Sequence, residues 1–329
     1  MANGGVWLDV RYRTAVVIGK FYPPHRGHKL LIDTAVSLAE QVTVIVCGKK
    51  EHTIPGETRG EWIREIHPEA TVLVIDDLYS DDDSEEWARL TIGWLGYVPA
   101  AVFTSEDYGD RYAACMGARH ILVDKERAQV PCSGTAIREN PFLHWEYLEP
   151  PVRAWFVKRI CIVGAESTGT TTLAMALAEK LDTCWVPEYG REYSEKKMRR
   201  GDDNWTSDEF VHIALEQNRR ENEAARHANK LLICDTDAFA TILWHRRYMG
   251  FERPDLGAIA ASRTCHLYLL TGDEIPFVQD GFRDGEHIRH EMQNWFREAL
   301  TRQGMPWLEL QGSPSERLQT ALWRVRELF

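Results

Sequence analysis

The sequence has few of the features that mark secreted, membrane or nucleic-acid-binding proteins. Its 329 residues include only seven cysteines, none in a CxxC pair, which fits neither a disulfide framework nor a zinc ribbon. The longest apolar runs, such as residues 42–47 and 231–234, are far shorter than the roughly 20 residues that cross a bilayer. A net charge of −11 argues against a surface that neutralises a nucleic-acid backbone. We therefore expect neither a membrane span nor a nucleic-acid partner.

The composition is that of a folded protein with more than one core. Apolar residues make up 44% of the chain and charged residues 27%, both within the globular range. The length favours two domains of ordinary size. Residues 1–13 lack a hydrophobic stretch followed by a small-residue cleavage site, which predicts a cytoplasmic protein.

Strand-like and helical patterns alternate along the first half of the chain. This alternation predicts an α/β fold, with a parallel sheet covered by helices on both faces. The expected strands are residues 14–18, 42–47, 71–75, 101–104 and 119–123, and the expected helices are residues 27–40, 59–66, 84–95 and 109–116. A stretch rich in prolines and aromatics, residues 140–155, predicts an ordered connector. A new strand at 159–163 begins a second α/β unit, so we place the domains at residues 1–157 and 158–329.

The most informative segment follows the first strand and reads GKFYPPHRGH, residues 19–28. A strand end that opens a helix brings together backbone N–H groups and the positive end of the helix dipole, an arrangement that suits a triphosphate. His25 and His28 could then contact phosphate oxygens. Two histidines at this spacing can also be metal ligands or core residues. The adjoining glycine, prolines and strand favour the phosphate site.

A second segment, SGTAIR at residues 133–138, completes a pair of motifs with residues 19–28. Together they resemble the HxGH and SxTxxR motifs of the nucleotidyltransferases that transfer adenylate from ATP to a phosphate. The likeness is closest to the nicotinamide mononucleotide adenylyltransferases. Over nearly the whole chain it extends to the bifunctional NadR family, which adds a ribosylnicotinamide kinase domain. This implies an N-terminal Rossmann-like domain and a C-terminal P-loop NTPase-like domain. About a dozen residues precede the first strand, too few for the helix-turn-helix of some NadR proteins.

The resemblance also implies roles for individual residues of the first domain. His28 would stabilise charge on the α-phosphate of ATP, His25 would hold neighbouring oxygens, and Arg138 would grip the β- and γ-phosphates. Trp87 resembles the tryptophan that contacts the nicotinamide ring, although a helical tryptophan is as often a core residue. Residues 104–108 resemble a segment on the adenosine side, or form a plain loop. The full ATP- and NAD-binding set is Gly19, Lys20, Phe21, Tyr22, His25, His28, Ser133, Thr135 and Arg138.

The second domain begins with the layout of a phosphate-binding loop. GAESTGTT, residues 164–171, lies between an apolar strand and an amphipathic helix. The pattern GxxxxGK[ST] requires lysine at the position of Thr170. Backbone N–H groups and the helix dipole can still bind phosphate, and Thr171 could ligate Mg²⁺. The side chain that bridges the β- and γ-phosphates is missing, which leaves the kinase activity of this domain open.

Other features of the kinase family are present. The family EYGRE segment is represented by Glu188 and Arg191, and the segment ICDTD places Asp235 at a strand end as a Walker-B-like acid or a catalytic base. Arg283 lies in a segment that resembles the kinase lid. The implied kinase-like site consists of Gly164, Ser167, Thr168, Gly169, Thr170, Thr171, Thr172, Glu188, Arg191, Asp235, Asp237 and Arg283.

These observations predict a nicotinamide-nucleotide adenylyltransferase that uses Mg²⁺ with ATP and converts nicotinamide mononucleotide into NAD. Ribosylnicotinamide is a second substrate if the kinase-like domain is active. Two alternatives stay open. One is a catalytically weak NAD- or ATP-binding regulator or sensor of NAD metabolism, against which the complete first motif counts. The other is adenylyl transfer to nicotinic acid mononucleotide or another small phosphate compound. Family analogy also allows a homo-oligomer.

Overall fold

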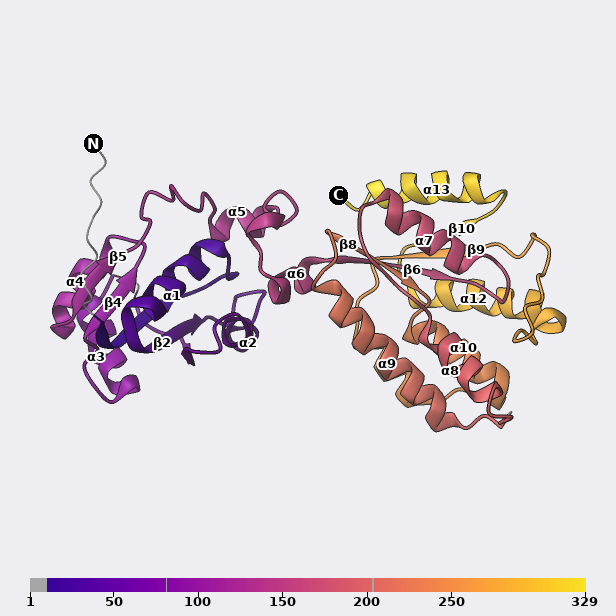
Figure 1. Cartoon of the computed structure of the whole chain (residues 1–329), viewed down its shortest axis with the longest axis horizontal. Coiled ribbons are helices and arrows are strands. Elements are labelled where there is room, and N and C mark those ends of the chain that lie inside the picture. The colour runs from indigo at the N-terminus through magenta and orange to yellow at the C-terminus, as the bar shows by residue number, and fades with distance from the viewer. Residues whose placement is uncertain (1–10, 81, 203) are drawn as a thin grey trace. The chain divides into compact units, whose positions relative to one another are not determined.

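The computed structural model describes residues 11–80, 82–202 and 204–329, which form two compact units, Met1–Val152 and Arg153–Phe329. Residues 1–10, on which the expected cytoplasmic location depends, lie outside the described residues. Each unit contains a five-stranded sheet in which the paired strands are parallel (Figure 1). The predicted fold class, α/β with two parallel-sheet domains, is therefore confirmed. Among the helices described, none is both long and apolar enough to cross a membrane.

The first unit has the sheet order β3-β2-β1-β4-β5. Its elements are β1 (Tyr12–Gly19), α1 (Arg26–Leu38), β2 (Ala39–Gly48), α2 (Gly56–Ile66), β3 (Thr71–Asp76), α3 (Ser84–Leu95), β4 (Ala101–Thr104), α4 (Tyr108–Met116), β5 (Arg119–Leu122) and α5 (Gly134–Glu139). Strands β2 and β3 lie on one side of β1, and β4 and β5 lie on the other, so the direction in which successive strands are added reverses between β1 and β4. In open parallel sheets ligands bind at the carboxyl ends of the strands at this switch point, which is where residues 19–28 leave β1.

The two faces of β1 are both buried, as expected for a central parallel strand. Ala15 and Val17 pack with α1 and α2, whereas Val16 and Ile18 pack with α3 and α4. The helix expected over 27–40 ends at Leu38, because Ala39 already pairs with Tyr12 in the β2–β1 ladder. The connector contains the short 3-10 helix η1 (Trp145–Tyr147) and α6 (Pro150–Phe156), with Trp145 buried.

The second unit has the sheet order β10-β9-β6-β8-β7. Its elements are β6 (Lys158–Val163), α7 (Thr170–Lys180), β7 (Trp185–Val186), α8 (Tyr189–Met198), α9 (Ser207–Ala225), β8 (Leu231–Asp235), α10 (Ala238–Met249), α11 (Pro254–Ala261), β9 (Leu267–Thr271), η2 (Glu286–Ile288), α12 (Arg289–Gln303), β10 (Trp307–Leu310) and α13 (Pro314–Arg326). Helices α7 and α13 cover one face of this sheet, and α9, α10 and α12 lie on the other (Figure 1). The central strand β6 therefore delivers residues 164–169 to the middle of the carboxyl edge.

Candidate active sites

The first histidine motif starts helix α1 in an unusual way. His25 is the N-cap residue, and its Nδ1 accepts a hydrogen bond from the Gly27 N–H at 3.1 Å. A Cβ at position 27 would lie only 3.0 Å from the His25 ring, so the close approach favours glycine there. Because Nδ1 acts as an acceptor, the proton of the neutral ring lies on Nε2. His25 thus presents an N–H donor from the start of the helix.

The second imidazole stacks on the first. The ring centroids of His25 and His28 are 3.7 Å apart, and the rings of Phe21 and His28 form a T-shaped pair with centroids 5.0 Å apart. Burial lowers the pKa of His25 to about 4 and that of His28 well below its usual value, and the positive charge of Arg127 adds to both effects. Both rings are therefore neutral near pH 7 in the free site. His28 Nδ1 is buried and has no hydrogen-bond partner among the described residues.

The SGTAIR segment reaches the same place through Tyr22. Ser133 caps α5 by accepting from the Ala136 N–H at 3.2 Å. Arg138 donates to Thr135 Oγ1 at 3.1 Å and to the Tyr22 carbonyl, and its guanidinium lies 4.5 Å from the centre of the Tyr22 ring. The two motifs, far apart in sequence, therefore meet in the folded unit.

A cavity of about 630 Å³ lies between these groups. All ten residues that we expected to bind nucleotide in this domain line it: Gly19, Lys20, Phe21, Tyr22, His25, His28, Trp87, Ser133, Thr135 and Arg138. Of residues 104–108, Ser105, Glu106 and Tyr108 line it as well. Thr104 instead contacts His120 Nε2 at 2.8 Å, and Asp107 pairs with Lys125 at 2.5 Å. Trp87 is 9% exposed and is at once a core residue and part of the wall.

Arg59 holds the backbone that surrounds this cavity, and it was not singled out from the sequence. It is fully buried, and it donates to the backbone carbonyls of Lys20, Cys47 and Ile54. Its Nη2 also lies 3.1 Å from Nδ1 of His52, whose ring stacks on Tyr22 with centroids 4.3 Å apart. Arg59 thereby ties the turns after β1 and β2 together. The available signal was its i, i+4 spacing to Ile63, which places both residues on the buried side of α2.

Asp77 is a second residue that sequence reasoning missed. Its side chain is almost fully buried, with Lys49 Nζ 3.5 Å from Oδ2. Neither carboxylate oxygen has a hydrogen-bond partner among the described residues, although Asp77 lines the same cavity as Trp87. The charge of Lys49 offsets part of the cost of burying this carboxylate, and a hydrogen-bond donor from a ligand would offset more of it.

The phosphate-binding loop of the second unit keeps its backbone geometry. Gly169 has φ of +87°, which favours glycine, and α7 begins at the next residue. A Cβ on Gly164 would lie 2.5 Å from the hydroxyls of Thr168 and Thr271, so that position also requires glycine. Thr168 itself points into this packing and donates to the Ala165 carbonyl at 2.8 Å. The loop is thus preorganised even though Thr170 stands where lysine is usual.

The residues that could hold Mg²⁺ are in contact. Thr171 Oγ1 donates to Asp235 Oδ2 at 2.5 Å, while Asp235 Oδ1 is buried and lacks a partner within the described part of the chain. Burial raises the pKa of Asp235. The described residues contain no cluster of three or more histidine, cysteine or acidic side chains that could hold a metal. This does not conflict with Mg²⁺, which in phosphoryl-transfer sites is held by one or two protein oxygens, phosphates and water.

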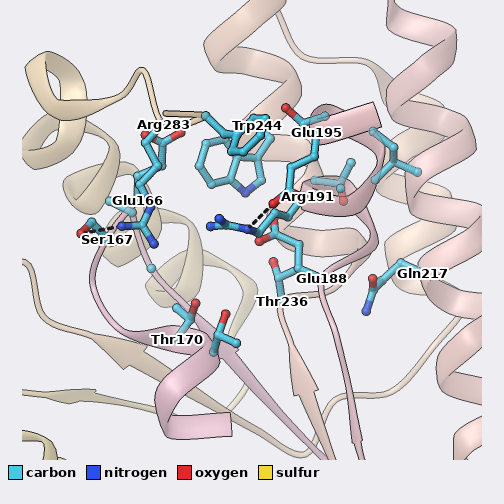
Figure 2. A pocket seen from close by; sticks show the side chains of 18 of the residues that line it. Glu166, Ser167, Thr170, Glu188, Arg191, Glu195, Gln217, Thr236, Trp244 and Arg283 are labelled. Carbon is cyan, nitrogen blue, oxygen red and sulfur yellow. Dashed lines mark hydrogen bonds and ion pairs between the residues drawn. The ribbon is translucent and has the colours of Figure 1, made fainter. Parts of the chain in front are cut away.

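A second cavity, of about 180 Å³, opens above this loop (Figure 2). The expected residues that line it are Gly164, Ser167, Gly169, Thr170, Thr171, Thr172, Glu188, Arg191 and Arg283. Thr168, Asp235 and Asp237 do not line it. Asp237 instead caps α10 through the Ala240 N–H at 3.0 Å, and it accepts from Arg263 at 2.9 Å and from the Tyr268 hydroxyl at 2.7 Å. The structure thus places Asp237 in a buried network.

Aromatic residues form another part of the same wall. Sequence reasoning did not select them, because twelve tryptophans gave no basis for a choice. They are Trp205, Phe210, Trp244 and Tyr248. Trp205 and Tyr248 pack with ring centroids 5.3 Å apart. The cavity therefore combines a polar loop with an aromatic, apolar wall, as small-molecule sites commonly do.

Glu188 makes this cavity sensitive to pH. Burial, together with the nearby charge of Asp235, raises the pKa of Glu188 to about 8. Between its usual value and 8 the folded chain holds a proton that the unfolded chain releases, so stability falls as pH rises through that window. Glu188→Gln should therefore raise the Tm of the second unit by about 3 °C at pH 9 and leave it nearly unchanged at pH 4.5. Calorimetry at both pH values checks this, with Glu298→Gln as an exposed control. An equal shift at both pH values would contradict it.

Comparison with known proteins supports the two-part organisation. A cytidylyltransferase-like family model matches residues 16–140, and an AAA domain model matches residues 159–317. The chain is 28% identical over 326 residues to the trifunctional NAD biosynthesis/regulator protein NadR of Escherichia coli K12, covering 90% of this chain and 78% of that protein. The NadR protein of Salmonella typhimurium LT2 is 29% identical over 315 residues, covering 87% and 75%.

Solved structures show the same fold. A NadR protein crystallised in complex with NR superimposes with a TM-score of 0.79 at 23% identity, covering 96% of both chains. A NadR protein in complex with NAD and AMP-PNP gives a TM-score of 0.74 at 22% identity, again covering 96% of both chains. Over nearly its whole length the chain is therefore similar to the NadR proteins, and it combines a cytidylyltransferase-like N-terminal unit with a P-loop C-terminal unit.

Proposed function

We propose that the first unit transfers adenylate from ATP to nicotinamide mononucleotide, which gives NAD and pyrophosphate. The observation that carries this proposal is the convergence of His25, His28 and Arg138 on one cavity at the end of β1. In the reaction a phosphate oxygen of the mononucleotide bonds to the α-phosphorus of ATP as the bond to pyrophosphate breaks. Because no covalent enzyme intermediate is needed, positioning and charge stabilisation supply the catalysis. The curated relatives are named as NAD biosynthesis proteins, and one fold neighbour holds NAD and AMP-PNP.

The geometry supports a separate task for each cation or donor. His25 offers its Nε2–H at the N-terminus of α1, where the helix dipole also attracts phosphate. His28, whose ring lines the cavity beside His25, is proposed to contact the α-phosphate, where negative charge grows in the transition state. Arg138 is proposed to hold the β- and γ-phosphates and to stabilise the departing pyrophosphate.

The acceptor half of the cavity favours nicotinamide over nicotinate. Trp87 offers an aromatic surface for the pyridine ring. Asp77 can accept a hydrogen bond from the carboxamide NH₂ group, whereas the carboxylate of nicotinic acid mononucleotide would bring a second negative charge beside it. We therefore prefer the amide substrate.

Replacing Asp77 tests this assignment. Asp77→Asn removes the charge at nearly constant shape and should lower the ratio of kcat/KM for nicotinamide over nicotinic acid mononucleotide by about tenfold or more. Steady-state assays with each mononucleotide give the ratio. Asp76→Asn, at an exposed neighbouring position, is the matched control and should leave the ratio unchanged. A ratio that stays at the wild-type value in Asp77→Asn would remove Asp77 from the acceptor site.

For the second unit we propose phosphorylation of ribosylnicotinamide by ATP. The intact phosphate loop, the Thr171–Asp235 pair and the aromatic wall support this assignment. Thr171 and Asp235 would hold Mg²⁺, which neutralises phosphate charge when it is bound with ATP. Thr170 is the observation that favours the alternative, a nucleotide-binding sensor with little kinase activity.

One experiment separates these functions. Purified protein is incubated with Mg²⁺, ATP and one of three acceptors: nicotinamide mononucleotide, nicotinic acid mononucleotide or ribosylnicotinamide. Products are followed by chromatography. NAD from the first acceptor supports adenylyl transfer, and mononucleotide from ribosylnicotinamide supports the kinase. Nucleotide binding without either product would favour the sensor.

A further inference from the structure

The phosphate loop of the second unit needs a cation that its own sequence does not supply. Phosphoryl transfer concentrates charge on the β- and γ-phosphates, and in P-loop enzymes a lysine at the position of Thr170 bridges them. A threonine hydroxyl carries no charge to replace it. If this site binds ATP productively, another side chain in the cavity must contact the terminal phosphates.

Several arginines contact the loop without being able to do this. Arg289 donates to the Ser167 carbonyl at 3.1 Å, and Arg317 donates to the Thr168 carbonyl at 2.7 Å. Both are buried and neither lines the cavity. Arg247 is bound to Glu166 at 2.9 Å and to Asp284, and its side chain is 5% exposed. These three guanidinium groups hold the loop and its surroundings in shape.

Two other arginines face the cavity from different segments. Arg283 Nη1 lies 3.2 Å from Ser167 Oγ, and Arg191 extends from α8 with its Nε bound to Glu195 at 3.0 Å. Figure 2 shows the Arg191 guanidinium reaching across the pocket above Thr170, on the side where Ser167 and Arg283 lie. The same oxygen joins them, because Asp280 Oδ2 is 2.5 Å from Arg191 Nη2 and 3.3 Å from Arg283 Nε.

We propose that Arg191 and Arg283, held together by Asp280, form a two-arginine clamp that binds the terminal phosphates of ATP in place of the missing lysine. Asp280 offsets the repulsion of two nearby cations while the site is free. Guanidinium groups suit this task because their planar donors match phosphate oxygens in pairs. When the γ-phosphoryl group moves, its bond to the β–γ bridging oxygen breaks and a bond to the substrate hydroxyl oxygen forms. The hydroxyl proton is released to water, and the clamp stabilises the ADP that remains.

The clamp predicts a coupling between position 170 and the two arginines. This inference rests on the proposed kinase function, but nucleotide binding can test it without an acceptor. Wild-type protein, Arg283→Gln and Arg191→Gln are titrated with the imido analogue of ATP and Mg²⁺ by calorimetry, and each change is repeated in a Thr170→Lys background. We expect two sites in the wild type. Each glutamine variant should weaken one of them about 30-fold, but only about threefold in the lysine background.

Controls separate a specific effect from a loss of structure. Arg219→Gln, on the exposed side of α9, should leave both sites unchanged, and Arg283→Lys should restore part of the lost affinity. The clamp would be overturned if the glutamine variants lost the same affinity in the threonine and lysine backgrounds. It would also be overturned if neither variant changed the affinity of either site when Thr170 is present. The kinase assay answers the other question. If the nucleotide affinities show the coupling but ribosylnicotinamide is not phosphorylated, the clamp stands and the proposed kinase activity is refuted. If phosphorylation occurs and neither arginine variant changes it, the kinase activity stands and the clamp is refuted.

Discussion

Replacing His28 with alanine should lower the rate of adenylyl transfer from ATP to nicotinamide mononucleotide by about 10²–10³-fold, with little change in the affinity for ATP. The reason is the stage of the reaction at which the contact between His28 and the α-phosphate becomes strong. His28 lines the cavity and is neutral, so its proposed contact strengthens only as charge develops on the α-phosphate. An interaction realised mainly in the transition state raises kcat more than it lowers the dissociation constant of ATP.

The measurement combines single-turnover kinetics with equilibrium binding of ATP. His227→Ala, an exposed histidine of the second unit, is the control for general effects of losing an imidazole. Because His28 stacks on His25, circular dichroism and thermal unfolding should confirm that the variant is folded. Turnover equal to that of the wild type would refute the role of His28. A parallel loss of ATP affinity would assign it to ground-state binding instead.

The second large effect is expected at Asp235. Asp235→Asn should lower phosphoryl transfer to ribosylnicotinamide by about 10³-fold, because it removes the charge that holds Mg²⁺ beside Thr171 or accepts the substrate proton. The change preserves shape, and asparagine can still contact Thr171 through its side-chain oxygen. Adenylyl transfer should be unchanged, because Asp235 belongs to the other unit.

Separate assays of the two reactions on the same preparation provide the test. Asp255→Asn, at an exposed position in the first turn of α11, is the control. A loss of both activities in Asp235→Asn would indicate unfolding rather than chemistry. Full kinase activity in this variant would exclude Asp235 from the site.

Local patterns were enough to predict the first sheet, the strand that opens the second unit, and both phosphate-binding turns. An apolar strand, a glycine-bearing turn and an amphipathic helix follow one another along the chain, so each unit is visible in a short window. The meeting of Arg138 with Tyr22 is different, because more than a hundred residues separate them. It was expected only through the resemblance to a known family.

Other parts of the sites were beyond sequence reasoning for physical reasons. Arg59 and Asp77 are charged residues that the fold buries, against the general tendency of such side chains to stay in solvent. Asp235 was expected as the acid at the strand end, but Asp237, two residues later in ICDTD, was expected in the same site. The structure distinguishes them, since Asp235 contacts Thr171 while Asp237 is bound by Arg263 and Tyr268.

The uncharged state of the paired histidines has a consequence for the conditions under which the protein works. With the pKa of His25 lowered to about 4 and that of His28 also well below its usual value, neither ring gains a proton when its surroundings acidify from pH 8 to pH 6. Most exposed histidines titrate within that interval. In the free protein, therefore, the two imidazoles add no positive charge to the end of β1 during a mild acid stress, and they do not act there as acid sensors.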